Sequence, residues 1–510
     1  MDVDDPLSSG PEMVPDLIRL DDIPENFLQR VETDLLETSV FQAATATRGG
    51  FARFELAQKG FLHSHSKLLL SVVPPAGQGG YALLPANIGI ASLIDRAVLK
   101  VRKSGQVIND IQDFGHFHAI KSAQISNETN REREQYMTGR MMNKEFKYYS
   151  DDGAAAQAIF NADLSLGYGL DNGRDYTGTG AARGEAQQGL TMPFAQIDSA
   201  APTESPTYSI DISDLFLFMK TQSLPLYMID QGLTIELHLS QAATDRVVRG
   251  TGFGGAASPS YVVDVNELKL VADYIHYTED DAMNRYRDAN PVIDLTFSDY
   301  RLSKNSRTKL EINNGFVRQL GMNNRVVPRV VTILSREGAA NSEFADGGLM
   351  NKYNMIAPLG TEEVAGVVPA GRRALSYNIR YKSRFEFSQP ISNKARAFTQ
   401  LTQSEGLPFV SMQEYSTDGG GYLIGRTAGA LQTPTTASTF EGKSQAAQLG
   451  GHFFILGTRL TNGRVANDGV ELHLGATLPG ADGDEYVVRS YLEYIRRARL
   501  EGGEMQILNA

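Results

Sequence analysis

"GLTIELHLSQ" occupies residues 232–241, and its central tetrapeptide, Glu-Leu-His-Leu, occurs again at residues 471–474 within "GVELHLGATL". In both copies apolar and polar residues alternate, which is the pattern of a β-strand with one buried face and one wet face. Such a repeat has three explanations: a duplicated pair of metal ligands, a duplicated domain, or chance. The residues around the two copies distinguish between them.

The two copies lie within longer segments that resemble each other in the same order along the chain. Both copies are followed by a Tyr-Val-Val that begins a long strand pattern, and both are preceded by a strand–turn–strand that enters a helical stretch. The four matched pairs are 59–72 with 314–331, 101–110 with 379–393, 236–239 with 471–474, and 261–277 with 486–500. Four matches in one order indicate a duplicated domain.

Short strand patterns separated by Gly, Pro, Ser and Asn fill most of the chain, and continuous helical patterns are few. This predicts an all-β protein with two tandem antiparallel domains instead of a parallel βαβ architecture. The polar segment "EDDAMNRYRDANPV" (279–292) ends at a proline and marks the boundary. We therefore expect an N-terminal arm at 1–40, a first domain at 41–285 and a second at 286–510.

The composition is that of a soluble globular protein. Hydrophobic residues make up 41% and charged residues 21% of the 510 residues, which supports more than one core. No apolar run reaches the ~18 residues of a membrane-spanning helix, and the N-terminus lacks the pattern of a secretory signal. Cysteine is absent, which excludes disulfides, thiolate metal sites and thiol catalysis and fits synthesis in a reducing compartment.

The first 40 residues are strongly acidic, with eleven Asp and Glu against Arg19 and Arg30. Proteins that bind nucleic acid replace counterions with Lys and Arg, so we expect no direct contact between this arm and a genome. A capping-box-like start at 22–25, followed by Leu28, Val31 and Leu35 at helical spacing, predicts a short helix in the arm.

Four polar residues of the repeated strand could bind a metal ion. Glu236 and His238 project from one face of their strand, as do Glu471 and His473 of theirs. The alternative is that they are the wet members of an amphipathic strand whose apolar residues point inward. The alternation favours the second reading.

Two His-x-His pairs, His63 with His65 and His116 with His118, have the spacing found in metal-binding cupins. Those sites need a carboxylate a few residues later, and neither pair has one. Exposed or hydrogen-bonded histidines are the simpler interpretation.

Three further motifs lack the context that their chemistry requires. "ASTFEGKS" (437–444) fits a relaxed P-loop pattern but has no preceding strand and no following helix. "GTGFGG" (250–255) joins two strand patterns, and Asn127 is the acceptor of a lone glycosylation sequon. We predict no catalytic, cofactor-binding or metal site, no cofactor and no enzymatic activity.

Two long segments rich in small residues, 151–188 and 418–451, are flanked by strand patterns. They are predicted to be loops that extend from a β scaffold, where partner contacts usually lie.

Three stretches of the chain resemble the double jelly-roll major capsid proteins, in particular those of virophages and polinton-like viruses. They are "FELAQKGFLHSHSKLLLSV" (54–72), "ASLIDRAVLKVRKSGQVINDI" (91–111) and "ISDLFLFMKTQSLPLYMIDQGLTIELHLS" (212–240). The resemblance extends over residues 40–505. The same lineage includes adenovirus-like viruses, tailless membrane-containing phages and large eukaryotic DNA viruses.

This resemblance implies two tandem eight-stranded antiparallel jelly rolls with short helices and long loops. It also implies a structural capsid protein whose homotrimers form pseudo-hexameric capsomers in an icosahedral virion. The partners would be other copies of the chain, neighbouring capsomers, and penton, minor capsid or cement proteins, and an internal membrane is compatible with the lineage. The alternatives are a β-sandwich carbohydrate-binding protein or hydrolase, and a β-rich tail fibre or spike.

Overall fold

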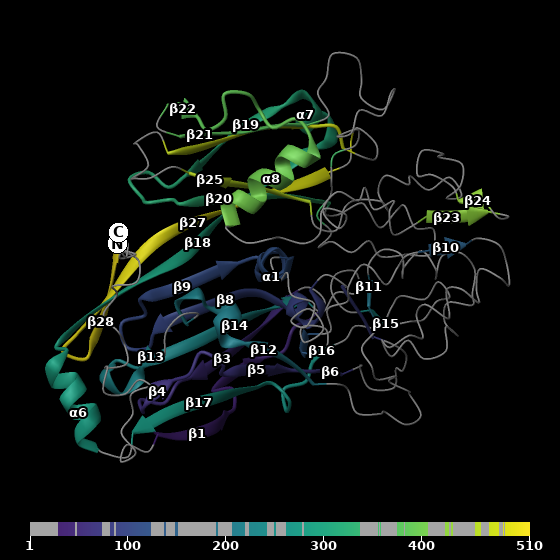
Figure 1. Ribbon diagram of the computed structural model, residues 1–510. Coiled ribbons are helices and arrows are strands. Elements are labelled where there is room, and N and C mark those ends of the chain that lie inside the picture. Colours follow the sequence, from purple (N-terminus) through teal and green to yellow (C-terminus); the bar gives the residue numbers. More distant parts are fainter. Residues whose placement is uncertain are drawn as a thin grey trace, which may run out of the picture.

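The computed structural model describes residues 29–45, 48–73, 82–85, 88–123, 137–138, 148–150, 190–191, 207–219, 224–241, 249–250, 262–277, 280–336, 355, 358, 375–381, 383–405, 424–427, 430–431, 454–460, 469–478, 483 and 485–509. These residues form two β sandwiches that lie one against the other (Figure 1). We call them the first sandwich, which contains β1 to β17, and the second sandwich, which contains β18 to β28.

The first sandwich consists of two antiparallel sheets. One has the strand order β1–β17–β5–β12, and the other has the order β3–β14–β8–β9 with β2 beside β3. Their bounds are β1 Gln29–Leu36, β2 Val40–Gln42, β3 Gly49–Glu55, β5 Lys67–Leu70, β8 Ile94–Val101, β9 Val107–Gln112, β12 Tyr208–Asp211, β14 Leu233–Gln241 and β17 Lys269–Tyr277.

The second sandwich also has two antiparallel sheets. Their strand orders are β18–β27–β20–β25, with β28 beside β27, and β19–β26–β21–β22. Their bounds are β18 Val292–Thr308, β19 Phe316–Gly321, β20 Arg329–Arg336, β21 Leu375–Tyr381, β22 Arg384–Phe385, β25 Ile455–Arg459, β26 Val470–Ala476, β27 Glu485–Glu501 and β28 Glu504–Asn509.

Shorter elements complete the described chain. The strands are β4 Phe61–Leu62, β6 Val72–Val73, β7 Ala82–Pro85, β10 Tyr148–Ser150, β11 Leu190–Thr191, β13 Leu224–Pro225, β15 Arg249–Gly250, β16 Val262–Val263, β23 Ile424–Thr427 and β24 Ala430–Leu431. The helices are η2 Gly89–Leu93, α1 Phe114–Ala123, α5 Ile212–Leu215, η5 Leu217–Met219, η6 Leu226–Met228, α6 Asp280–Ala289, α7 Lys309–Asn314 and α8 Lys394–Glu405. Within the described residues, no helix has the length and apolar character needed to cross a membrane.

The two sandwiches have the same connectivity. If the eight principal described strands of each are numbered along the chain, one sheet has the order 1–8–3–6 and the other 2–7–4–5, in both sandwiches. This confirms the predicted duplication. The strand with Glu-Leu-His-Leu is the seventh in each case: β14 lies between β3 and β8, and β26 lies between β19 and β21.

The matched segments agree with this numbering at two of four places. The strand–turn–strand segments form the fourth and fifth strands, β8–β9 and β21–β22, and each leads into a helix, α1 or α8. At a third, the Tyr-Val-Val match does not hold, because Val262–Val263 form the separate strand β16 beside β6, whereas Tyr486 lies in the eighth strand β27. The pairing of Phe61 with Phe316 is wrong. Phe61 lies in β4 beside the eighth strand of the first sandwich, whereas Phe316 begins the second strand of its own.

The helix predicted in the N-terminal arm is also wrong where the structure describes it. Residues 29–36 form β1, which pairs with β17 along its whole length from Gln29↔Tyr277 to Leu36↔Leu270. Val31 and Leu35 satisfy both a helical spacing and a strand alternation, and pairing with β17 decides in favour of the strand. Residues 1–28 lie outside the described part.

A three-stranded extension of the second sandwich reaches the first. β18 and β27 each have 17 residues and pair over their full length, but only 486–493 of β27 also pair with β20. Beyond that point β27 pairs with β28 instead, and the strands pass β9 of the first sandwich (Figure 1). The turn between β27 and β28 contacts the first sandwich: the amide of Asp230 donates to the carbonyl of Gly503 over 2.9 Å.

Candidate functional site

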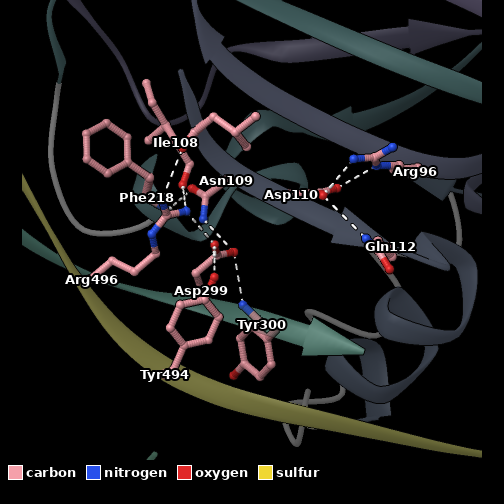
Figure 2. Close-up of polar contacts among 11 residues, drawn as sticks. Arg96, Ile108, Asn109, Asp110, Gln112, Phe218, Asp299, Tyr300, Tyr494 and Arg496 are labelled. Carbon is pink, nitrogen blue, oxygen red and sulfur yellow. Dashed lines mark hydrogen bonds and ion pairs between the residues drawn. The ribbon is translucent and has the colours of Figure 1, made fainter. Parts of the chain in front are cut away.

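Asp299 of β18 is a buried carboxylate where the two sandwiches meet, and its exposed fraction is 1% (Figure 2). Its Oδ1 accepts from Nδ2 of Asn109 in β9 at 3.1 Å and from the amide of Tyr300 at 2.9 Å. Its Oδ2 accepts from the hydroxyl of Tyr494 and from Nη1 of Arg496, both at 2.9 Å. Four donors thus satisfy one buried carboxylate.

Arg496 connects the same cluster to the backbone of β9. It donates to the carbonyl of Ile108 at 2.6 Å and to that of Val107 at 3.1 Å. Asn109 in turn accepts from the amide of Phe218 at 3.2 Å. Burial raises the pKa of Asp299, although its partners Asn109, Tyr494 and Arg496 act in the opposite direction.

Asp113, in the turn between β9 and α1, forms an ion pair with the second sandwich, and its side chain is 21% exposed. Nε of Arg489 donates to its Oδ2 at 2.6 Å, and Nδ1 of His116 lies 2.6 Å from its Oδ1. Arg489 is fully buried and also donates to the hydroxyl of Ser335. Burial by itself would raise the pKa of Asp113, but His116 and Arg489 outweigh it and hold that pKa well below its ordinary value.

Aromatic rings fill the space between these two polar clusters. Phe117 of α1 packs against Tyr300 at 4.8 Å and against Tyr491 at 5.7 Å between ring centroids. Phe218 meets Phe297 edge to face at 4.8 Å. Rings at these separations pack favourably, so the junction combines an apolar layer with two satisfied buried charges.

The paired charges hold the two sandwiches together, because separating the sandwiches would leave buried charged groups without partners, which is costly. We refer to these contacts, centred on Asp113 and Asp299, as the junction. Sequence reasoning missed it. A charge that interrupts an apolar strand pattern, as Arg489 does in "YVVRSYL", was the available signal.

The repeated Glu-His pairs lie in different sheets, so the two copies do not form one site. Glu236 in β14 bonds Arg53 at 2.8 Å and also pairs with Lys100. Glu471 in β26 bonds Arg380 at 3.1 Å and His473 at 3.2 Å. Both carboxylates are thus held in ion pairs along their own sheet.

The His-x-His pairs are likewise separate. Nδ1 of His63 accepts from the backbone amide of His65 at 3.1 Å, whereas His116 belongs to the junction and His118 is buried beside Phe114. Among the described residues, no three His, Asp or Glu side chains are grouped as metal ligands would be. The "ASTFEGKS" motif, Asn127 and most of "GTGFGG" lie outside that part of the chain.

The chain segments that contain the two predicted loops contribute strands to one short sheet. β10 and β23 pair in parallel from Tyr148↔Ile424 to Ser150↔Arg426, and β24 continues the sheet. β10 belongs to the segment between the fifth and sixth strands of the first sandwich, and β23 to the equivalent segment of the second. β10 ends just before the predicted loop 151–188, all of which lies outside the described residues, and of the predicted loop 418–451 only β23 and β24 are described.

A chain in the cryo-EM structure of the Sputnik virophage has the same arrangement of strands. The TM-score is 0.51 at 8% sequence identity, and the match covers 94% of this chain and 88% of that one. The fold is a double jelly roll. Two other structures align at lower scores. The Faustovirus major capsid protein has a TM-score of 0.49 at 9% identity, and the match covers 92% of this chain and 90% of that one. The mavirus major capsid protein has a TM-score of 0.47 at 10% identity, and the match covers 94% of this chain and 90% of that one. No family model and no curated protein matches the sequence.

Proposed function

We propose that this double jelly roll is a structural major capsid protein whose homotrimers form pseudo-hexameric capsomers of an icosahedral virus shell. One observation carries the proposal: the chain contains the same eight-strand connectivity twice, in two sandwiches that are joined by direct polar contacts. Three such chains related by a threefold axis place six similar sandwiches around one centre, and this gives a nearly hexagonal tile. The shared fold with a chain of the Sputnik virophage structure supports it.

We also propose a domain division that follows the duplication. The boundary between the rolls at residues 285 and 286 falls within α6, the helix that joins β17 to β18. The first roll begins earlier than the sequence indicates, because β1 belongs to it. The acidic arm then comprises the residues before Gln29.

The proposed partners are other copies of the chain, neighbouring capsomers, and penton, minor capsid or cement proteins. The arm, with its excess of Asp and Glu, would contact protein and not the genome. An internal membrane beneath the shell is compatible with this role. Deleting residues 1–28 should impair shell assembly and leave the trimer folded, whereas loss of nucleic acid from intact shells would contradict the assignment.

We propose that the two long insertions form the outer crown of the trimer. β10, which immediately precedes residues 151–188, pairs with β23 of 418–451, and this supports a common location for both. If they are ordered by contacts between chains, limited proteolysis should cut them slowly in the trimer. Rapid cutting without a change in the melting temperature would show that they are free surface loops.

The capsid role is tested by light scattering and electron microscopy of the purified chain. A homotrimer that assembles into closed shells or hexagonal sheets is the expected result. A monomer that binds oligosaccharides would instead favour the carbohydrate-binding or hydrolase alternative. A trimer that forms rods would favour a fibre.

A further inference from the structure

The two sandwiches contribute different strands to the junction. In the first sandwich, the contributing elements are the fifth strand, β9, and the turn at Asp113 that follows it. In the second sandwich, they are the first and eighth strands, β18 and β27, which pair with each other. A fifth-strand edge therefore packs against a first-and-eighth-strand face.

Because the two sandwiches have one connectivity, each also possesses the other half of this contact. The first sandwich has its own first and eighth strands, β1 and β17, and the second has its own fifth strand, β22. In Figure 1, β1 and β22 lie at opposite ends of the pair of sandwiches. The two unused halves therefore cannot meet within one chain.

Both unused halves expose large apolar side chains. On β1, Val31 is 57% and Leu35 is 63% exposed, and they lie opposite Ile275 and Val271 of β17. Between them, the hydroxyl of Thr33 donates to Asp273 at 2.6 Å. We call this surface the β1 face. Apolar side chains gathered on one outer face of a sheet are typical of an interface.

The other half lies at the far end of the molecule. Phe385 of β22 is 52% exposed and meets His473 edge to face at 4.9 Å. Val317 of β19, which lies opposite His473 in the sheet, is 54% exposed. We call these three residues the Phe385 patch. Phe385 lies in β22, the fifth strand of the second sandwich, which corresponds to β9 in the first.

The charged side chains next to these two surfaces are paired within the chain. Glu32 and Asp34 alternate with Val31 and Leu35 along β1, so they project from its other face, where they pair with Lys59 at 2.6 and 2.8 Å. Arg380, which lies opposite Phe385 in the sheet, pairs with Glu471 at 3.1 Å. What the two surfaces offer a partner is therefore mainly their exposed apolar side chains.

We propose that the β1 face of one chain binds the Phe385 patch of a second copy of this chain, and so repeats between chains the contact that the junction makes within one. The proposal rests on the trimer proposed above and names the surfaces that form it. The interface is heterologous, because the two surfaces differ, and a heterologous contact closes into a ring only when its rotation permits. Three copies with two sandwiches each would close it.

The absence of cysteine from the chain allows a clean crosslinking test. Single cysteines are placed as Leu35→Cys and Phe385→Cys, and the full-length double variant is treated with a flexible bis-maleimide. A heterologous ring gives covalent trimers for the double variant and no crosslinked species for either single variant. A mixture of the two single variants stops at covalent dimers.

Other outcomes overturn the proposal in distinguishable ways. Covalent dimers from Leu35→Cys alone would show a self-complementary contact at β1. A trimer by light scattering without crosslinks in the double variant would place the interface elsewhere and leave the capsid role standing. A monomer would remove the trimer as well.

A charge substitution gives an independent measurement. Leu35→Arg should convert most of the trimer to monomer at concentrations at which the native chain stays trimeric. The matched control is Leu310→Arg on α7, where the leucine is 43% exposed and lies outside both surfaces. Equal dissociation by both variants, or by neither, contradicts the proposal.

Discussion

Arg489 in the second sandwich donates from Nε to Oδ2 of Asp113 in the first, over 2.6 Å, and its side chain is fully buried. The two residues are 376 positions apart in the sequence. Their ion pair is therefore a contact between the two rolls that neither roll can satisfy alone. Its energetic weight can be measured.

Replacing Asp113 by Asn should destabilise the protein strongly. Asn tolerates the left-handed backbone of this position, where φ is 51°, and the change removes the charge and one of the two oxygens that Arg489 and His116 contact. It leaves the buried guanidinium of Arg489 uncompensated, and we expect a loss of about 3–5 kcal/mol in the free energy of unfolding. Denaturant titration at constant chain concentration measures it.

A matched control lies three residues away. Asp110 forms a two-pronged ion pair with Arg96 at 2.6 and 2.7 Å, but this pair is much more exposed (Figure 2). Asp110→Asn should cost only about 0–1 kcal/mol. Equal losses for the two variants would refute the view that burial gives the Asp113 pair its weight.

The Asp113 pair should also make stability depend on pH at the acid end. Its pKa is lower in the folded chain than in the unfolded chain, so the carboxylate stabilises the fold above the unfolded pKa of about 3.9. This contribution is lost as the pH falls toward the folded pKa. The difference in unfolding free energy between the native chain and Asp113→Asn should shrink below about pH 4. A difference that is unchanged at lower pH would show that charge is not its source.

Asn109 and Asp299 should be strongly coupled. Both are almost completely buried, and each provides a partner for the other across the junction. A double-mutant cycle with Asn109→Ala and Asp299→Ala should show an interaction energy of about 1–3 kcal/mol. As the control cycle, Asn109→Ala with Glu471→Ala should be additive within about 0.5 kcal/mol, because Glu471 lies in another sheet.

Two neighbouring glycines test whether the β27–β28 turn is held against the first sandwich. Both have positive φ, 57° at Gly502 and 81° at Gly503, so alanine strains either position. A Cβ at Gly502 would meet no atom, whereas one at Gly503 would collide with the side chain of Asp230. Gly503→Ala should therefore cost about 1–3 kcal/mol more than Gly502→Ala, the range of other unrelieved packing conflicts. Equal melting temperatures would show that the turn is not docked.

The sequence predicts the duplicated fold well because the strand pattern of β14 and β26 is set locally, by alternation and flanking turns. It fails at β1 because Val31 and Leu35 fit two periods, and only the distant β17 selects between them. It fails at Phe61 because a short Gly-Phe match carries no information about which strand it begins.

The junction could not be predicted from the sequence for a related reason. Asp299 and Arg496 occur in ordinary-looking strand patterns, and nothing local indicates that their partners are Asn109 and the backbone of β9. Such contacts depend on how two finished sandwiches meet. The interpretation of the Glu-His pairs as wet members of amphipathic strands holds in part: Glu471 and His473 are half-buried, but Glu236 is buried with Thr234 and Ser240 on the same side of β14.

The length of β18 has a consequence for how the chain is made on the ribosome. All 17 of its residues pair with β27, which is synthesised far later. Until β27 emerges, β18 has neither its main hydrogen-bonding neighbour nor the residues that join Asp299 to Arg496 and Tyr494. The first roll can close during translation, whereas the second must wait with an unpaired strand, the kind of intermediate on which chaperones act.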